Sequence, residues 1–177
     1  TATDRRTHAG HGLTVWTEFP QDDLPSASLF EPQTNAVRVL IPPGSGVSLG
    51  SPEVNNLNHV VIRRSFGGQN VVESYDAAGG PPLLHAVSAT ADNSSPYSNV
   101  GIPVIDDLRR VAAEVRLGEP GMGAISQPDQ LVRFNVDGST TILVEDQDSN
   151  PSSPFNRFEG TRIDNSDSGN LVAFLAR

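Results

Sequence analysis

The sequence predicts an all-β protein made of a repeated antiparallel sheet, and three observations lead to that prediction. Sixteen glycines and 14 prolines are spread over 177 residues, and residues of these types break up any long helix. Between them lie short runs rich in valine, leucine, isoleucine and phenylalanine, which are typical of strands. One such run, preceded by an acidic or amide-rich turn, recurs along the chain and indicates an internal repeat.

This turn and its strand, which we call the marker, identify each unit. The marker reads "VNNLNHVVIRRS" from Val54, "IDDLRRVAAEVR" from Ile105 and "IDNSDSGNLVAFLAR" from Ile163. A more diverged copy, "RTHAGHGLTVWTE", lies near the start of the chain. The marker strands recur about every 50 residues, within the range of structural repeats, and begin at Leu13, Val60, Val111 and Val172.

Three further strand-like runs follow each marker in the same order, and the last leads directly into the next marker. Separated by turn residues, they predict four antiparallel strands per unit. The second strands are expected at 26–32, 70–76 and 130–138, the third at 36–41, 83–88 and 140–146, and the fourth at 47–54, 97–105 and 155–163.

We therefore expect a single repeat domain over residues 1–177. Its units span about 12–58, 59–109 and 110–169, and an extra strand occupies 170–177. Three such units can form an open arc, or close with threefold pseudo-symmetry as a β-trefoil or β-prism. The extra strand is surplus to whole units, so we expect it to find hydrogen-bond partners elsewhere.

The third marker permits a second interpretation. Its apolar residues sit at helical spacing behind an aspartate pair that could cap a helix. Alignment with the other markers favours a strand, and we predict a strand there. The stretch 118–129, "GEPGMGAISQPD", is expected to be a loop inserted between the first two strands of the third unit.

Composition excludes several classes of function. The net charge of -9 and pI of about 4.7 disfavour binding to nucleic acid or anionic membrane. All 12 cationic residues are arginine, which excludes a phosphate-loop lysine and a Schiff base. The sequence has no cysteine, so disulfides and thiolate sites are excluded. No apolar run is long enough to span a bilayer, so we expect no membrane insertion.

The repeat resembles a family of secreted or surface-anchored bacterial proteins whose tandem repeats carry an Asn-x-x-Gly turn before a Val-x-Phe strand. Within this chain, "IDNSDSGNLVAFLA" and the preceding 137–160 match best. Asp137–Gly138 match the hairpin turn of that family, and 153–158 its Ser/Phe-rich fourth strand. The glycine of the pattern is absent from "NNLNH" and "DDLRR". The resemblance implies propeller-like blades, an extracellular or cell-surface location and a non-catalytic role.

Two motifs suggest chemistry. Asp146, Asp148 and Asn150 have the alternate spacing of a calcium loop, so a structural calcium ion is one interpretation. The other is a polar turn, because Asp, Asn and Ser dominate turns. "GVSLG" places Ser48 in a G-x-S-x-G pattern, but that motif needs a helix after the serine, and Pro52 opposes one. We therefore expect no catalytic residue and no other cofactor.

Histidines and aromatic residues are the remaining candidates. His8 and His11 are close enough in sequence to share a metal, whereas His59 and His85 fall in expected strand regions; satisfied or solvated histidines are the simpler interpretation. Trp16, Tyr75 and Tyr97 could stack on a sugar ring, although aromatic residues in strands are more often part of the core. The candidate histidines and aromatics are His8, His11, His59, His85, Trp16, Tyr75 and Tyr97.

The sequence thus predicts a non-enzymatic structural or adhesion protein that associates with its own kind through exposed strands. Strand donation between copies would give a ring or a filament. A carbohydrate-binding module with a glycan partner is the alternative function. The self-association strand is expected at Leu171, Val172, Ala173, Phe174, Leu175 and Ala176.

Overall fold

The structure is a computed structural model that describes residues 4–10, 13–19, 25–44, 47–119, 128–163 and 172–176. These residues form β-strands, turns and loops, with no helix among them. The all-β prediction is therefore confirmed. No described helix could cross a membrane.

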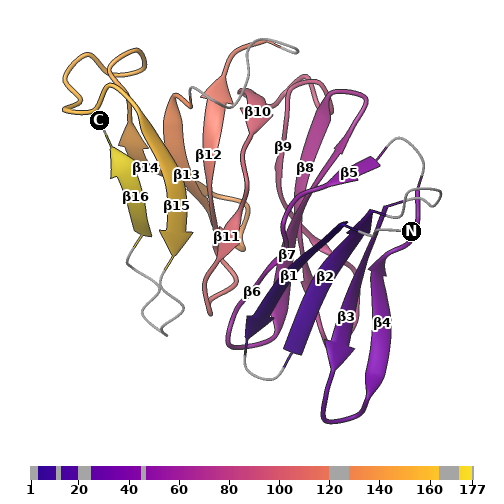
Figure 1. Cartoon of the computed structure of the whole chain (residues 1–177). Coiled ribbons are helices and arrows are strands. Elements are labelled where there is room, and N and C mark those ends of the chain that lie inside the picture. The colour runs from indigo at the N-terminus through magenta and orange to yellow at the C-terminus, as the bar shows by residue number, and fades with distance from the viewer. Residues whose placement is uncertain are drawn as a thin grey trace.

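The strands form four separate antiparallel sheets that follow one another in chain order across the molecule (Figure 1). The first sheet contains β1 (Asp4–Gly10), β2 (Leu13–Phe19), β3 (Ser26–Glu31) and β4 (Ala36–Ile41). The second contains β5 (Val47–Leu49), β6 (Glu53–Val54), β7 (His59–Phe66), β8 (Gln69–Asp76) and β9 (Leu83–Val87).

The third sheet repeats the plan of the second, and the fourth has two described strands. The third sheet contains β10 (Tyr97–Val100), β11 (Val104–Ile105), β12 (Val111–Leu117), β13 (Gln130–Phe134) and β14 (Thr140–Glu145), and the fourth contains β15 (Phe158–Ile163) and β16 (Val172–Ala176). The sheets are open and stand side by side like blades, as the propeller-like prediction requires and unlike a β-trefoil or β-prism.

The boundaries of the sheets differ from those of the expected units by one strand. We expected each unit to begin at its marker strand, at about 12, 59 and 110. Instead, the strand before each marker pairs with the marker strand, as β6 does with β7 and β11 with β12. A short turn joins these strands, and antiparallel strands joined by a tight turn pair with each other. The strand before the first marker, β1, was not predicted from the sequence; it pairs with β2.

Residues 170–177, expected as a surplus strand, include β16. This strand pairs antiparallel with β15 of the same chain, so one of its edges already has a partner. The third marker is also resolved: Val111–Leu117 is strand β12, not a helix. The expected inserted loop at 118–129 lies largely outside the described residues.

A Gly-x-Pro sequence divides the first strand of the second and third sheets at the same place. Gly50 and Pro52 separate β5 from β6, and Gly101 and Pro103 separate β10 from β11. Each glycine still donates its N–H to the neighbouring marker strand, to the carbonyl oxygens of Arg63 and Glu114 at 2.9 and 2.7 Å. Proline has no N–H to donate, so the pairing is interrupted there and resumes at the next residue, Glu53 in β6 and Val104 in β11.

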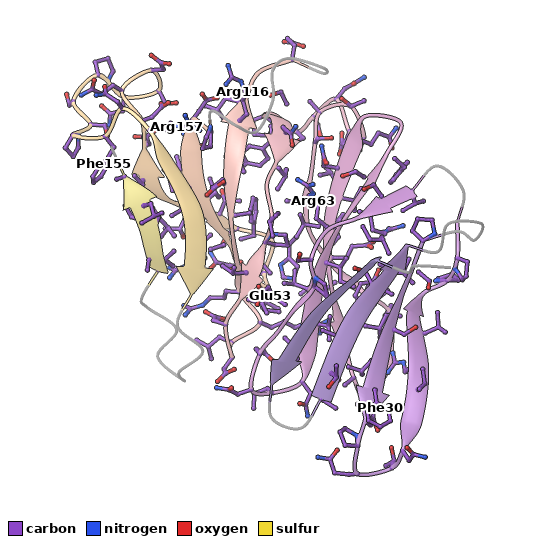
Figure 2. All side chains as sticks on the ribbon, in the orientation of Figure 1. Phe30, Glu53, Arg63, Arg116, Phe155 and Arg157 are labelled. Atoms are coloured by element: carbon purple, nitrogen blue, oxygen red, sulfur yellow. The ribbon has the colours of Figure 1, made fainter. Side chains whose placement is uncertain are left out.

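The core lies between the sheets, in two separate clusters. The first fills the space between sheets one and two and includes Val15, Leu29 and Ile62; the second fills the space between sheets two and three and includes Val72 and Phe134. Figure 2 shows side chains filling the spaces between neighbouring sheets, with Phe30 and Phe155 at opposite ends of the molecule.

Strand β7 supplies both clusters, because successive side chains of a strand point to opposite faces. Val60 and Ile62 pack toward the first sheet, and Val61 between them packs toward the third. All three are 0% exposed. Burying an aliphatic side chain of this size stabilises a fold by about 1.5–3 kcal/mol, so β7 contributes to holding three sheets together.

Replacing Ile62 by alanine is expected to lower the free energy of unfolding by about 2–5 kcal/mol, because it leaves a cavity in the first cluster. Ile142→Ala is the matched control, since Ile142 is 52% exposed, and its cost should stay below about 1 kcal/mol. Urea titration followed by circular dichroism measures both. Equal costs for the two variants would contradict this account of the core.

Candidate functional site

The marker turns share one internal design. Asn55 and Asp106 occupy equivalent positions, and both are 0% exposed. The side-chain oxygen of each accepts the backbone N–H four residues later, from His59 and Arg110, at 2.8 Å in both cases. The backbone N–H of Asn55 and of Asp106 donates to the carbonyl of that same residue at 3.0 Å. Each turn is thus closed by one buried residue, which accepts a hydrogen bond through its side chain and donates one through its backbone.

The turn position at which the repeat pattern has glycine, and this chain does not, adopts a backbone conformation that favours glycine. At the fourth position of each turn, Asn58 and Arg109 have positive φ angles of 66° and 61°. Glycine adopts this conformation freely, asparagine visits it routinely, and other residues lose about 1–2 kcal/mol. Arginine is therefore an unusual choice at position 109, and its side chain must offset the strain.

One turn docks on the next. The side-chain amide of Asn55 donates to the carbonyl oxygen of Asp106 at 2.6 Å. The backbone and side-chain amides of Asn56 donate to the two carboxylate oxygens of Asp107 at 2.7 and 2.8 Å. We call this contact between the second and third sheets the polar seam. The equivalent turn before β16 lies outside the described residues.

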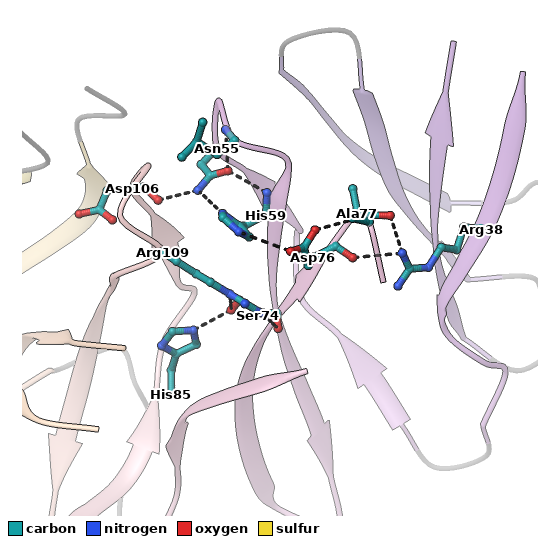
Figure 3. A network of polar contacts seen from close by, with 11 residues as sticks. Arg38, Asn55, His59, Ser74, Asp76, Ala77, His85, Asp106 and Arg109 are labelled. Carbon is teal, nitrogen blue, oxygen red and sulfur yellow. Dashed lines mark hydrogen bonds and ion pairs between the residues drawn. The ribbon is translucent and has the colours of Figure 1, made fainter. Parts of the chain in front are cut away.

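Arg109 extends the polar seam toward the second sheet (Figure 3). Its Nε and one terminal nitrogen donate to the Oγ and the carbonyl oxygen of Ser74, at 2.9 and 3.0 Å. Nε2 of His85 lies 2.8 Å from the same Oγ. The hydroxyl of Ser74 accepts from the guanidinium of Arg109 and shares a second hydrogen bond with His85 Nε2, since a serine hydroxyl has one proton and two lone pairs.

Burial and the positive charge of Arg109 lower the pKa of His85 to about 4. Burial and Arg109 also lower the pKa of His59, against opposing contributions from Asp76 and Asp107. On the other flank, Arg38 of the first sheet donates to the carbonyl oxygens of Asp76 and Ala77. The polar seam therefore fixes the second sheet relative to the third, and Arg38 fixes it relative to the first. The hydrogen bonds of these side chains are made to other residues of the chain.

Ser48 lies in β5, exposed and paired with Ser65. The two described histidine side chains bond elsewhere: His59 to Asn55, and His85 to Ser74. Within the part of the chain that the structure describes, Ser48 therefore has no histidine partner. The side chain of His8 and all of His11 fall outside this part.

The proposed calcium ligands form a polar turn. Asp146 is buried, and its Oδ1 accepts the backbone N–H of Ser149 at 2.9 Å. Asn150 donates its side-chain amide to Glu145 at 3.0 Å, while Asp148 is exposed. Among the described residues no group of three or more His, Cys, Asp or Glu side chains could hold a metal. Calcium binding stays a prediction.

The tyrosines considered for sugar stacking are used in packing. Tyr75 is buried in the first cluster, and its hydroxyl donates to Glu73 at 2.9 Å; burial raises its pKa. Tyr97 packs edge-to-face on Phe134 at a ring distance of 5.8 Å. Both rings therefore contribute to packing, Tyr97 while half-buried, and the Trp16 side chain lies outside the described part.

The predicted self-association strand corresponds to β16, except for Leu171, which lies outside the described residues. One edge of β16 pairs with β15, and no other described strand pairs with its second edge. Its sequence, VAFLA, carries no charge, and Leu175 is 66% exposed. Phe174 packs edge-to-face on Phe155 with ring centres 5.6 Å apart. This aromatic contact ties β16 to the segment that leads into β15.

The segment between β14 and β15 is itself held in place. Gln147 donates its backbone N–H to the carbonyl oxygen of Phe155 at 2.9 Å, and the Ser153 hydroxyl donates to the carbonyl oxygen of Glu145. Phe155 is therefore a fixed support for Phe174. β16 is therefore held in place by its contact with Phe155. Its second edge is the strongest candidate for a functional site in the described chain.

No family model and no curated protein matches this sequence. Chains of solved structures do match. One of these chains comes from a structural and mechanistic study of two prolyl endopeptidases, which concerns the role of inter-domain dynamics in catalysis and specificity. It matches with a TM-score of 0.55 and 14% sequence identity. The likeness covers 98% of this chain but 24% of that chain. At this identity it shows the fold alone, and it supports the propeller-like arrangement of sheets.

Variants of Arg109 separate backbone strain from side-chain bonding. Arg109→Ala and Arg109→Gly both lose the bonds to Ser74, but only glycine relieves the positive φ. We expect both to destabilise the fold, with the glycine variant more stable than the alanine variant by roughly 1 kcal/mol. At Asn58 the same pair serves as control, and Asn58→Gly should be close to the wild type. Chemical denaturation measures all four; an alanine variant as stable as the glycine variant would refute the strain.

Acid is expected to destabilise the fold through His85. Its folded pKa, about 4, lies below the ordinary value of 6.5, so the unfolded chain binds the proton first as pH falls. This contribution to stability is complete above pH 6.5 and is lost between pH 6.5 and 4, amounting to roughly 3 kcal/mol at 1.36 kcal/mol per pKa unit. Unfolding free energies between pH 7 and 4 should fall less steeply for His85→Gln. An identical slope for the two proteins would exclude this role.

Proposed function

We propose that this chain is a non-enzymatic structural module that associates with other copies of itself through the open edge of β16. The observation that carries the proposal is that β16 is an uncharged, largely exposed strand, one edge of which pairs with β15 while no described strand pairs with the other. Such an edge presents a row of backbone donors and acceptors that invites another strand. The anchoring of Phe174 on Phe155 supports the proposal, because a fixed strand loses little conformational entropy on pairing.

The location we propose is extracellular or at the cell surface. This part of the proposal rests on the resemblance of the marker turns to secreted and surface-anchored repeat proteins. The absence of catalysis is supported by the placement of Ser48, whose hydroxyl meets neither described histidine. An esterase activity that Ser48→Ala abolishes would contradict it.

Self-association is tested with a matched pair of lysine variants. Leu175→Lys places a charge on β16, whereas Leu84→Lys places one on β9, where Leu84 is similarly exposed at 55%. We expect the wild type and Leu84→Lys to associate alike, and Leu175→Lys to associate at least about tenfold more weakly, because a charge on an edge strand opposes pairing. Analytical ultracentrifugation over a wide concentration range measures this. A wild type that stays monomeric throughout would refute the proposed function.

A further inference from the structure

The side chain of Arg109 links the second and third sheets at the end where the marker turns lie. It extends from its turn to the preceding sheet, where its guanidinium donates to the Oγ and the carbonyl oxygen of Ser74 at 2.9 and 3.0 Å (Figure 3). Ser74 is 0% exposed. At this interface between sheets, a guanidinium from one turn is therefore received by a strand of the sheet before it.

The corresponding place between the first and second sheets can be located from the strand pattern. β3 and β8 are the third strands of their sheets. Leu29 in β3 and Val72 in β8 are both fully buried on the face that each sheet turns toward the next. Alternate residues of a strand share a face, so two residues further along, Glu31 has the position in the first sheet that Ser74 has in the second.

The marker turn on this side carries asparagine instead of arginine. Asn58 is the equivalent of Arg109 and has the same positive φ, but its side chain is much shorter. A pocket of about 300 Å³ lies here, at the lower end of the range for small-ligand sites. It is lined by the residue in the place of Arg109 and by the residue in the place of Ser74. The lining includes Leu13, Glu31, Gln33, Leu57, Asn58 and Asp76.

The pocket is suited to a cation with an apolar stem. Glu31 and Asp76 bring two carboxylates to it, and none of the described residues that line it is cationic. Each carboxylate already accepts one hydrogen bond, from the Thr34 hydroxyl at 3.1 Å and from the Ala78 N–H at 2.8 Å, and has lone pairs for others. Leu57 is 58% exposed and adds apolar surface along which an alkyl stem can lie.

Two basic side chains lie close to Asp76 without lining the pocket. Arg38 donates to the carbonyl oxygens of Asp76 and Ala77. Nε2 of His59 lies 3.9 Å from Oδ2 of Asp76, and burial and Arg109 lower the pKa of His59, so this ring is mainly uncharged at neutral pH. The single positive charge of Arg38 therefore stands against two carboxylates, and the surroundings of the pocket stay negative.

We infer that this pocket binds the guanidinium of an arginine side chain from a partner peptide. Guanidinium presents a planar set of donors that matches carboxylate geometry, and Arg109 shows the same group bound at the equivalent place in this chain. A free amino acid would bring its own carboxylate, which Glu31 and Asp76 would repel. An arginine within a peptide is therefore the expected form. The inference does not depend on association through β16.

Blocked amino acids test the site, with binding followed by ¹H–¹⁵N NMR of the full chain. Nα-acetyl-arginine amide should shift the amide signals of Leu57 and Ala78 in a saturable way. The citrulline counterpart has the same shape without the charge, and it should bind at least about tenfold more weakly, because bonds between charged groups are the stronger ones. Free arginine should also bind more weakly than the blocked form.

Three variants locate the site. Asn58→Arg supplies the missing side chain from the turn itself, as Arg109 does one sheet later, and should abolish binding of blocked arginine while leaving the fold intact. Glu31→Gln keeps the size of the side chain and should weaken binding at least about tenfold. Asp137→Asn removes a charge from the exposed turn between β13 and β14, away from the pocket residues. It is the matched control and should bind as the wild type does.

The outcomes separate a specific site from general attraction to an acidic chain. Binding that is lost in Asn58→Arg, weakened in Glu31→Gln and kept in Asp137→Asn supports the inference. Equal weakening in Glu31→Gln and Asp137→Asn would overturn it, as would citrulline binding as tightly as arginine, or pocket signals that do not shift in the wild type. Free arginine that binds as tightly as the blocked form would overturn the peptide assignment. Each of these results leaves association through β16 to its own test.

Discussion

Burial of the second sheet on both faces is the constraint on which the structure depends. A strand presents alternate side chains to opposite sides, and in the first half of β7 the side chains on both sides are apolar and buried. Val60 and Ile62 require the first sheet, and Val61 requires the third. Hairpin turns alone would fix only the pairing within a sheet. This two-sided burial, reinforced by the polar seam, brings separate sheets together into one molecule.

Repetition made the strands predictable from sequence, and it even resolved an ambiguous segment. The apolar residues of 108–115 fit a helix taken alone, but comparison with Val60 and Val172 indicated a strand, and Val111–Leu117 is one. The unit boundaries could not be found in this way. A repeat looks the same wherever its period is cut, and the pairing of β6 with β7 depends on a turn whose hydrogen bonds periodicity does not reveal.

The polar seam was missed for a related reason. "NNLNH" and "DDLRR" differ at most positions, so the shared roles of Asn55 and Asp106 are visible only when both turns are aligned and read as hydrogen-bond acceptors. The absent glycine was noted in the sequence, and the positive φ of Asn58 and Arg109 is a backbone conformation that glycine adopts freely. The bond from Arg109 to Ser74 joins residues 35 positions apart; no local pattern encodes it.

The division of the core into two clusters has a consequence for how such a chain can change over evolution. Within the part of the chain that the structure describes, no buried residue belongs to both clusters, so each sheet needs only a suitable neighbour on either side. Duplication or loss of one whole unit in the gene would therefore require no redesign of the remaining interfaces. The sheet at either end would simply acquire, or give up, an adjoining layer, and the number of units could drift while the chemistry of every interior contact stayed constant.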